Sequence, residues 1–296
     1  MLSYRHGFHA GNHADVLKHF VLVQILDYLN QKDAAYTIVD THAGAGLYTL
    51  ESGFAAKTGE YQTGIARLWG RDDIPAALQS YLDIVASLNP DGRLRHYPGS
   101  PYFAEQLMRE QDRLRLFELH PTESKVLQDN CAQLEESARQ QGRRNLQRGK
   151  PILVTRQDGF DGMKSLLPPP SRRALVLIDP PYEIKDDYKR VKSSLEDALK
   201  RFPTGVYAVW YPVLQRNEAR QFAEKLKRLP CKSWLNVTLA IHGPMPDGIA
   251  LHNSGMFIVN PPWTLYETLE QVMPYLNEVL QHASGHGFVL ESGENE

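Results

Sequence analysis

Four consecutive residues, Asp179, Pro180, Pro181 and Tyr182, have the types and spacing to bind an amine at the end of a strand. The preceding run, Ala174–Ile178, is apolar throughout, which predicts a strand buried on both faces of a parallel sheet. Ligands of such sheets bind beyond the carboxyl ends of the strands. There the Asp179 carboxylate and the Pro180 carbonyl of a rigid turn can accept hydrogen bonds, while Tyr182 offers a face for base stacking. The tetrapeptide therefore predicts a catalytic site for the exocyclic amine of a nucleobase, although it also fits a strand that simply ends in a proline turn.

A second tetrapeptide of similar composition, Asn260-Pro261-Pro262-Trp263, follows another apolar run at 255–259. Its place in the chain distinguishes it from the first, because strand-like segments still follow Tyr182, whereas only a helical stretch follows Trp263. Those later strand-like segments span 205–213, 234–241 and 255–259. With them the sheet has seven strands, mostly parallel, and Asp179 follows the fourth. We therefore predict that the Asn260 segment is a structural strand exit.

The remaining pattern alternates helices and strands, which predicts an α/β, doubly wound fold. Asn12 is a suitable N-cap for a helix over 12–29, and a strand at 36–39 leads into a glycine-containing loop at 40–46. Another helix begins near Pro101, with Ser100 as its predicted N-cap. Residues 51–95 have a helical pattern interrupted by glycine and proline, and we predict that they form a small inserted subdomain. The predicted main domain then comprises residues 1–50 and 96–296.

Acidic residues follow the second and third predicted strands, which span 114–119 and 152–155. Glu118 lies at the end of the second strand, where a carboxylate can accept both hydroxyls of a ribose. Asp158 follows the third strand, beside Gly159, and can accept the amino group of an adenine. These groups predict a pocket for a cofactor that contains adenosine but no pyrophosphate, a description that S-adenosylmethionine satisfies.

The composition limits the class of protein. At 296 residues the chain is long enough for a full α/β core, and Cys131 and Cys231 have the spacing of structural thiols rather than of a metal site. With neither a signal pattern nor a long apolar run, we expect a cytoplasmic protein without membrane contact. The net charge of −2 argues against general nucleic-acid binding, so that any such contact requires a local basic patch. Candidate residues, which fit solvated loop charges equally well, are Arg143, Arg144, Arg148, Lys150, Arg172 and Arg173.

Four segments together resemble the RlmJ family of bacterial 23S rRNA adenine-N6 methyltransferases. They are YRHGFHAGNHADVLKH at 4–19, DTHAG at 40–44, PGSP at 98–101 and DPPY at 179–182. The resemblance extends over nearly the whole chain, and the N-terminal block is its most specific part. It implies a Rossmann-like class I methyltransferase with a helical insertion, S-adenosylmethionine as methyl donor, and one adenine of 23S rRNA as target. The basic segment at 140–150 departs from the family by its greater length.

The resemblance also implies roles for individual residues. Cofactor contacts are implied for His19, His42, Ser100, Glu118, Asp158, Gly159 and Asp179. Substrate contacts are implied for Tyr4, His6 and Lys18. The product would be S-adenosyl-L-homocysteine, no metal would be required, and the protein would act as a monomer.

Other functions remain open at this point. Methylation of DNA adenine or of protein glutamine would use a similar tetrapeptide, and a non-catalytic protein could bind adenosine in the same pocket. The acid at Asp179 in place of an asparagine favours a nucleobase over glutamine, and the lack of a sequence-reading module disfavours DNA. The histidines at the N-terminus match no zinc spacing, so we predict no metal site.

Overall fold

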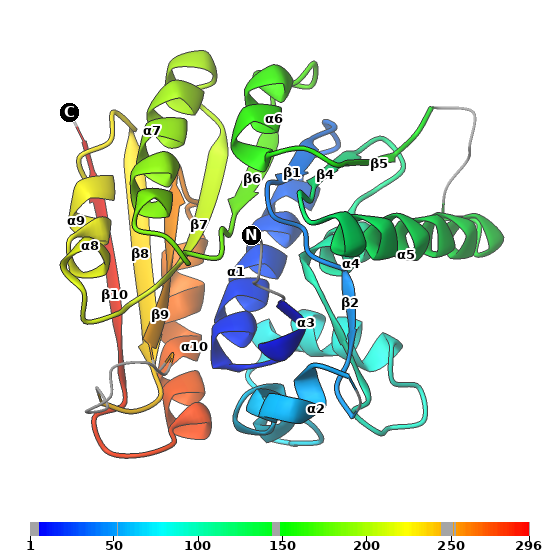
Figure 1. Ribbon diagram of the computed structural model, residues 1–296, viewed down its shortest axis with the longest axis vertical. Coiled ribbons are helices and arrows are strands. Elements are labelled where there is room, and N and C mark those ends of the chain that lie inside the picture. Colours follow the sequence, from blue (N-terminus) through cyan, green and yellow to red (C-terminus); the bar gives the residue numbers. More distant parts are fainter. Residues whose placement is uncertain (1–5, 52, 144–148, 244–250, 252, 296) are drawn as a thin grey trace.

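The computed structural model describes residues 6–51, 53–143, 149–243, 251 and 253–295. Eight strands form one large sheet: β1 (Thr37–Asp40), β4 (Arg113–Phe117), β5 (Ile152–Thr155), β6 (Ala174–Ile178), β7 (Val206–Pro212), β8 (Ser233–Ala240), β9 (Asn253–Val259) and β10 (Gly287–Glu294). Their order across the sheet is β10-β8-β9-β7-β6-β1-β4-β5 (Figure 1). Neighbours from β5 to β7 are parallel, β9 is antiparallel to β7 and β8, and β10 is antiparallel to β8. This is the doubly wound α/β arrangement that the sequence predicts.

Helices cover both faces of the sheet (Figure 1). One face carries α1 (His13–Asn30), α4 (Ser100–Leu107) and α10 (Leu265–Leu280), and the other carries α6 (Gly159–Leu166), α7 (Asp186–Arg201) and α9 (Phe222–Leu226). Further helices are η1 (His6–Phe8), α5 (Pro121–Gln140) and α8 (Asn217–Arg220). No helix in the described part of the chain is long and apolar enough to cross a membrane.

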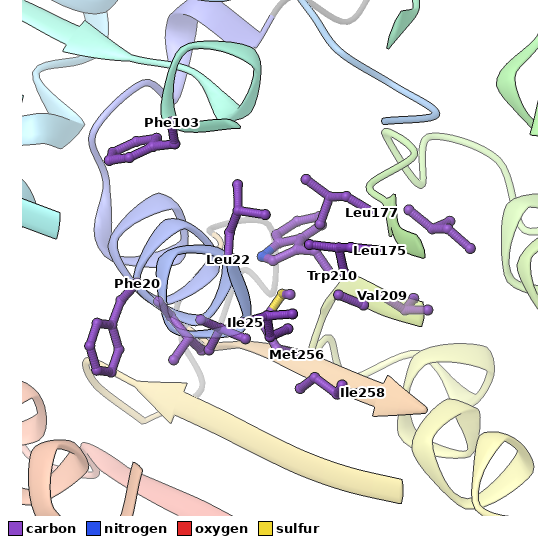
Figure 2. Close-up of a cluster of buried hydrophobic side chains, with 14 of the residues drawn as sticks. Phe20, Leu22, Ile25, Phe103, Leu175, Leu177, Val209, Trp210, Met256 and Ile258 are labelled. Carbon is purple, nitrogen blue, oxygen red and sulfur yellow. The ribbon is translucent and has the colours of Figure 1, made fainter. Parts of the chain in front are cut away.

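The core lies between α1 and the centre of the sheet. Helix α1 begins after Asn12, whose side chain accepts a hydrogen bond from the backbone N–H of Asp15 at 2.9 Å, as the sequence predicts. Figure 2 shows Leu22 and Ile25 of α1 close to apolar side chains of β6, β7 and β9, namely Leu175, Leu177, Val209, Met256 and Ile258. Every residue of β6 is buried. The strand that leads to Asp179 is therefore packed on both faces and holds that residue in a fixed position.

The stretch at 51–95 contains α2 (Ala55–Thr58), η2 (Glu60–Thr63), η3 (Ile65–Arg67) and α3 (Ala76–Ser87). It is helical, as predicted. A two-stranded antiparallel sheet, β2 (Leu47–Thr49) with β3 (His96–Pro98), joins its two ends, which the sequence did not predict. Buried side chains of α3, among them Leu78, Tyr81 and Val85, belong to the same hydrophobic cluster as the main core. The division of the chain into two domains stays a prediction.

The large sheet has eight strands, not the seven predicted. The additional strand, β10, pairs with β8 along its whole length, from Gly287 opposite Ala240 to Glu294 opposite Ser233. It lies at the edge of the sheet, and its apolar residues are confined to 288–290. Because an edge strand needs only one neighbour and is partly exposed, it lacks the long apolar run by which buried strands are recognised.

The Asn260 tetrapeptide leaves the sheet at the edge opposite to the exit of β6. Strand β9 is antiparallel to β7, and its last residue, Val259, lies opposite Tyr207 near the start of β7. The Asn260 side-chain amide donates to the carbonyls of Pro203 and Gly205, each at 2.8 Å. These bonds confirm that the segment is a structural strand exit, as the sequence predicts.

Candidate active site

The carboxyl ends of β1, β4, β5 and β6 lie at one edge of the sheet because these strands are parallel neighbours. A cavity of about 320 Å³ lies at this edge. Nine of the predicted site residues line it: His6, Lys18, His19, His42, Ser100, Glu118, Asp158, Gly159 and Asp179. The parallel arrangement therefore gathers most of the predicted residues around one cavity, which we call the larger cavity.

A second cavity, of about 170 Å³, adjoins the first and is called the smaller cavity here. The two share the lining residues His6, Lys18, Asp179 and Pro181. Other residues of the smaller cavity come from the start of α1, the loop after β6, and β7 with the segment that follows it, and they include Asn12, Asp15, Tyr182, Trp210 and Arg216. The Asp179 carboxylate thus stands at the junction of two cavities, where it can contact a ligand in each.

Asp179 forms an ion pair with Lys18 of α1. The Lys18 ammonium lies 2.6 Å from Asp179 Oδ2 and 2.9 Å from Asp15 Oδ1. Burial disfavours the ammonium form, but the two carboxylates outweigh this effect and raise the pKa of Lys18. Lys18 therefore stays protonated and fixes the Asp179 carboxylate. Its side chain is only 5% exposed, and its ammonium contacts Asp179 at the junction of the two cavities; the predicted substrate contact of Lys18 stays a prediction.

Asp15 connects this ion pair to the N-terminal segment. His6 Nε2 lies 3.0 Å from Asp15 Oδ2, and the backbone N–H of Gly11 donates to the same oxygen at 2.9 Å. Burial alone would raise the pKa of Asp15, but the charges of His6 and Lys18 outweigh it and hold this pKa well below 3.8. His6 thereby takes a fixed place beside both cavities. Tyr4, the other predicted substrate-side residue, lies outside the described residues.

Glu118 lies directly after β4 and lines the larger cavity. Its two carboxylate oxygens accept hydrogen bonds from the backbone N–H groups of Gly44, at 2.9 Å, and His120, at 2.7 Å. Burial raises the pKa of Glu118, although both N–H donors act in the opposite direction. Each oxygen has further lone pairs, so the carboxylate can still accept hydrogen bonds from a ligand.

Asp158 and Gly159 lie at the start of α6. Asp158 pairs with Arg190 of α7 at 2.7 Å; burial would raise the pKa of this carboxyl, but Arg190 outweighs the effect and lowers it. A Cβ at Gly159 would lie only 1.9 Å from the carbonyl oxygen of Thr41, so the close approach of these two loops requires glycine. Arg190 also lines the larger cavity and was missed, because a basic residue in a helix is normally read as a solvated charge.

Ser100 is the first residue of α4, and Gly99 is the N-cap, so the prediction that Ser100 caps the helix is wrong by one position. The Ser100 hydroxyl instead donates to Asp40 at 2.6 Å, and the other Asp40 oxygen accepts from the backbone N–H of His42 at 3.1 Å. Burial raises the pKa of Asp40 to about 6. Asp40 thus supports two residues of the larger cavity. It was not included in the predicted site, although it is the last residue of a buried strand and Asp179 directly follows one.

Burial keeps two histidines of the larger cavity neutral. It lowers the pKa of His42 to about 4 and the pKa of His19 well below 6.5. His42 Nδ1 lies 2.8 Å from the Thr41 hydroxyl, and His19 Nδ1 lies 2.9 Å from the Tyr97 hydroxyl. The other ring nitrogen of His19, Nε2, is buried and has no hydrogen-bond partner among the described residues. Such a nitrogen is expected to bind a ligand that enters the cavity.

Tyr182 does not present the open stacking face that the sequence predicts. Its side chain is 1% exposed, and its hydroxyl donates to the Trp210 carbonyl at 2.8 Å. The ring packs against Tyr188, Trp210 and Phe222, with centroid distances of 4.6, 6.0 and 6.0 Å. Tyr182 therefore forms part of the buried wall of the smaller cavity. The Pro180 carbonyl has no donor among the described residues and stays available to a ligand.

Two exposed apolar side chains also line the larger cavity and were missed by sequence reasoning. Leu119 is 44% exposed and Ile184 is 56% exposed. Apolar side chains at the rim of a polar cavity are suited to contact the faces of a planar ring. A single apolar residue in a loop gives no sequence signal for this role.

The structure only partly supports the predicted basic patch. Arg173 is engaged within the fold, since its guanidinium donates to the carbonyl of Leu29 at 2.8 Å. Arg143 lies 3.4 Å from Glu105, whereas Lys150 is exposed. The residues Arg144 and Arg148 lie outside the described residues. A role in phosphate binding stays a prediction for this segment.

The N-terminal histidines have partners other than a metal. His6 lies beside Asp15, and His9 lies 3.0 Å from Glu60, which carries its own hydrogen bond from Asn12. Within the described ranges, no group of three or more His, Cys, Asp or Glu side chains is arranged to hold a metal ion. These histidines therefore serve hydrogen bonding and ion pairing in the N-terminal segment.

The fold and the site define the class of protein: a Rossmann-like methyltransferase, with acidic residues after successive parallel strands and the tetrapeptide Asp179–Tyr182 after β6. The family profile described as "Ribosomal RNA large subunit methyltransferase D, RlmJ" matches residues 33–290. The chain therefore belongs to the RlmJ family.

Similar proteins cover almost the full length of the chain. It is 46% identical to Ribosomal RNA large subunit methyltransferase J of Escherichia coli (strain K12) over 98% of both chains. It is 44% identical to the protein of the same name from Haemophilus influenzae, over 95% of this chain and 94% of that one. Among solved structures, protein LPL1258 from Legionella pneumophila is similar, with a TM-score of 0.84 and 35% identity over 96% of this chain and 98% of that one.

Proposed function

We propose that this protein transfers a methyl group from S-adenosylmethionine to N6 of one adenine in 23S rRNA. The observation that carries the proposal is the junction of two cavities at the Asp179 carboxylate. The larger cavity suits an adenosine-containing cofactor, and the smaller one suits a base on the other side of the carboxylate. Both curated relatives are named as large-subunit ribosomal RNA methyltransferases, which supports RNA as the substrate class.

The residues of the larger cavity fit S-adenosylmethionine. Glu118 can accept hydrogen bonds from the ribose hydroxyls, and Asp158 can accept one from the adenine amino group. Leu119 and Ile184 would contact the adenine ring. The unpartnered Nε2 of His19 would serve the amino-acid end of the cofactor. When bound, S-adenosylmethionine supplies an electrophilic methyl group on its sulfonium sulfur.

Asp179 and Pro180 would prepare the target amine. The N6 lone pair of adenine is delocalised into the ring, which makes the amine a weak nucleophile. Hydrogen bonds from its two N–H groups to the Asp179 carboxylate and the Pro180 carbonyl would favour a pyramidal nitrogen with a localised lone pair. Lys18 holds the carboxylate in place through the 2.6 Å ion pair. Alignment of this kind contributes up to about 7–11 kcal/mol to the lowering of a reaction barrier.

The target base would enter the smaller cavity from an unstacked position. Extrusion of a base from a helix costs a few kcal/mol, so an unpaired adenine is the favoured substrate. The cavity offers apolar walls from Tyr182 and Trp210, together with the polar side chains of His6 and Arg216. This mixture of aromatic and polar groups is typical of sites that read a single flipped base.

A methylation assay tests the proposal. Purified protein and methyl-labelled S-adenosylmethionine are incubated with protein-free large-subunit rRNA from a strain that lacks the enzyme, and the digested RNA is analysed for N6-methyladenosine. We expect label in one adenine. Asp179→Ala should abolish incorporation, whereas the matched variant of the second tetrapeptide, Asn260→Ala, should retain it, because Asn260 lies at the opposite edge of the sheet.

The alternative functions give different results in the same assay. Label in DNA, or in glutamine of a protein, would show that the substrate belongs to another class than rRNA. Binding of the cofactor without transfer to any acceptor would indicate a non-catalytic adenosine-binding protein. Full activity of Asp179→Ala would refute the role of the tetrapeptide. Assembling ribosomal particles as a parallel substrate would show whether the enzyme acts before or after protein binding.

A further inference from the structure

Three buried side chains form a hydrogen-bonded chain from the inserted stretch to the larger cavity. The Tyr81 hydroxyl of α3 lies 3.1 Å from the Tyr97 hydroxyl of β3, and the Tyr97 hydroxyl lies 2.9 Å from His19 Nδ1 of α1. None of the three residues is more than 1% exposed. His19 is the last member of the chain, and it lines the larger cavity. Neither tyrosine is among the residues that line the two cavities.

All three groups are uncharged near neutral pH. Burial raises the pKa of Tyr81 and of Tyr97 far above the ordinary value of 10.0. For His19, burial lowers the pKa well below 6.5; the nearby charges of Lys18 and His6 act in the same direction, while that of Asp15 opposes it. Each of the three side chains therefore has one proton to donate, and the direction of the chain can be deduced by counting donors and acceptors.

Only one direction satisfies both hydroxyl groups. If Tyr81 donates to Tyr97 and Tyr97 donates to His19 Nδ1, both hydroxyl protons have acceptors and the imidazole proton is on Nε2. In the opposite direction, His19 Nδ1–H donates to Tyr97 and Tyr97 donates to Tyr81, whose own proton then has no acceptor among the described residues. Without a ligand, the first direction leaves only the buried His19 Nε2–H unpaired, whereas the opposite direction leaves both the Tyr81 hydroxyl proton and the Nε2 lone pair without partners among the described residues. Each unpaired buried polar group costs about 1–3 kcal/mol, which favours the first direction, and a ligand that accepts from Nε2–H favours it further.

We propose that Tyr81 and Tyr97 are positioning residues, which hold His19 as the Nε2–H tautomer so that this nitrogen donates to the carboxylate of the bound cofactor. The inference rests on the proposed function, because it takes S-adenosylmethionine as the ligand. It assigns to the inserted stretch, through Tyr81, a role in cofactor binding.

The part of the cofactor that His19 binds can be inferred from the polar residues around the larger cavity. Glu118 and Asp158 are acceptors and are suited to the hydroxyl and amino groups of adenosine. A carboxylate has only acceptors, so it requires donors, and the Nε2–H of a neutral His19 is such a donor. In the other tautomer a nitrogen lone pair would face the carboxylate and repel it. The orientation of the chain therefore decides whether His19 donates a hydrogen bond to the amino-acid end of the cofactor.

Aromatic packing holds the His19 ring in the required orientation. Phe103 of α4 stacks on the ring at a centroid distance of 4.8 Å and an interplanar angle of 30°. The same Phe103 stacks on Tyr81 at 5.5 Å and 16°, and it contacts Tyr97 edge-on at 6.3 Å. One phenylalanine thus contacts all three members of the chain. Removal of a single hydroxyl group should leave this packing intact.

The experiment compares two ligands by titration calorimetry. S-adenosylmethionine has the amino-acid end, whereas 5′-methylthioadenosine keeps the adenosine and lacks that end. We expect Tyr97→Phe to weaken S-adenosylmethionine about tenfold, the loss of one hydrogen bond to a charged group, and to leave 5′-methylthioadenosine within about twofold. His19→Phe should show the same selective loss. Tyr81→Phe should have a smaller effect in the same direction, because Tyr97 can still donate to His19.

A matched control is Tyr207→Phe, which removes a buried hydroxyl that donates to the Phe202 carbonyl at 2.7 Å, away from the cavity. It should change neither affinity. A measurement on the unaltered protein is independent of variant folding: ¹⁵N chemical shifts of labelled histidine should show His19 with its proton on Nε2.

Two results would overturn the inference: a proton on Nδ1 of His19, or an equal loss of affinity for both ligands in Tyr97→Phe. Failure of the unaltered protein to bind S-adenosylmethionine would instead refute the proposed function, so the two failures are distinguishable.

Discussion

Substitution of Lys18 by methionine would remove the cation that two buried carboxylates share. The Lys18 ammonium lies 2.9 Å from Asp15 and 2.6 Å from Asp179, and the three side chains are 5%, 2% and 13% exposed. Methionine has a similar length and fills the same space without the charge. Asp15 would keep His6 as a partner, whereas Asp179 would lose the ion pair that positions it.

The size of the effect follows from these distances. At an effective dielectric constant of about 20, each contact attracts by roughly 6 kcal/mol, and part of this is cancelled by the cost of burying the ammonium. Removal of one partner from a buried ion pair typically costs about 3–5 kcal/mol, because the remaining charge is uncompensated. We expect a loss of that size in the free energy of unfolding at pH 7.5. We also expect a loss of methyl transfer, because Asp179 is no longer held in position.

The contributions of Lys18 and Asp15 to the free energy of unfolding depend on pH in opposite directions. Because the folded pKa of Lys18 is raised above 10.5, its contribution to stability is complete below that pH and is lost only as the pH rises through the folded value. The pKa of Asp15 is depressed, so its contribution is present above 3.8 and is lost as the pH falls. In Lys18→Met the Asp15 carboxyl loses one of the positive charges that depress its pKa, so acid neutralises it at a higher pH than in the wild type. The difference in stability between the variant and the wild type should therefore narrow from pH 7.5 towards pH 4.5.

Urea unfolding followed by circular dichroism measures this loss. Lys164→Met is the matched control, because Lys164 has an ion pair of similar length, 2.8 Å to Asp161, with both side chains exposed, at 41% and 62%. An exposed pair of this kind is worth about 0–1 kcal/mol. If Lys18→Met and Lys164→Met unfold at the same urea concentration, the argument from burial is refuted.

Three further predictions concern other parts of the fold. Gly159→Ala should lower both stability and cofactor affinity, because its Cβ would lie 1.9 Å from the Thr41 carbonyl oxygen, whereas Gly287→Ala, with open space around it, should change neither; thermal unfolding and calorimetry measure the two effects. Burial lowers the pKa of His42 from 6.5 to about 4, so its contribution to stability is present above pH 6.5 and is lost as the pH falls towards 4. Between pH 7 and pH 5 the wild type should lose more stability than His42→Gln, by up to about 2 kcal/mol, as measured from urea midpoints. Parallel pH profiles of the two proteins would contradict this. Asn260→Ala should lower the free energy of unfolding by about 1–3 kcal/mol, since it loses two hydrogen bonds to backbone carbonyls, each at 2.8 Å, while methyl transfer is unchanged; a loss of activity without a loss of stability would contradict the structural assignment.

Local patterns in the chain were sufficient to predict the elements that position the site. The uniform apolar run of β6 predicted both its burial and the placement of Asp179 at its end. The limits of β5 agree with the predicted range 152–155, and α10 is the helical stretch predicted after Trp263. The count of later strands distinguished the two tetrapeptides. Periodicity and strand exits depend on neighbouring residues, and for that reason they can be read from the sequence alone.

The tertiary structure decided the features that depend on residues far apart in the chain. Lys18 and Asp179 are separated by 161 positions, and only the packing of α1 against the sheet brings them to 2.6 Å. The rotation of Tyr182 into the core likewise depends on β7 and α9, which no local pattern predicts. The chain of hydroxyl groups from Tyr81 to His19 requires three separate elements to meet. The pairing of β10 at the edge of the sheet and the hydrogen bond from Ser100 to Asp40 also depend on residues far apart in the chain. Packing sets the geometry of contacts between distant elements, and the order of neighbouring residues does not.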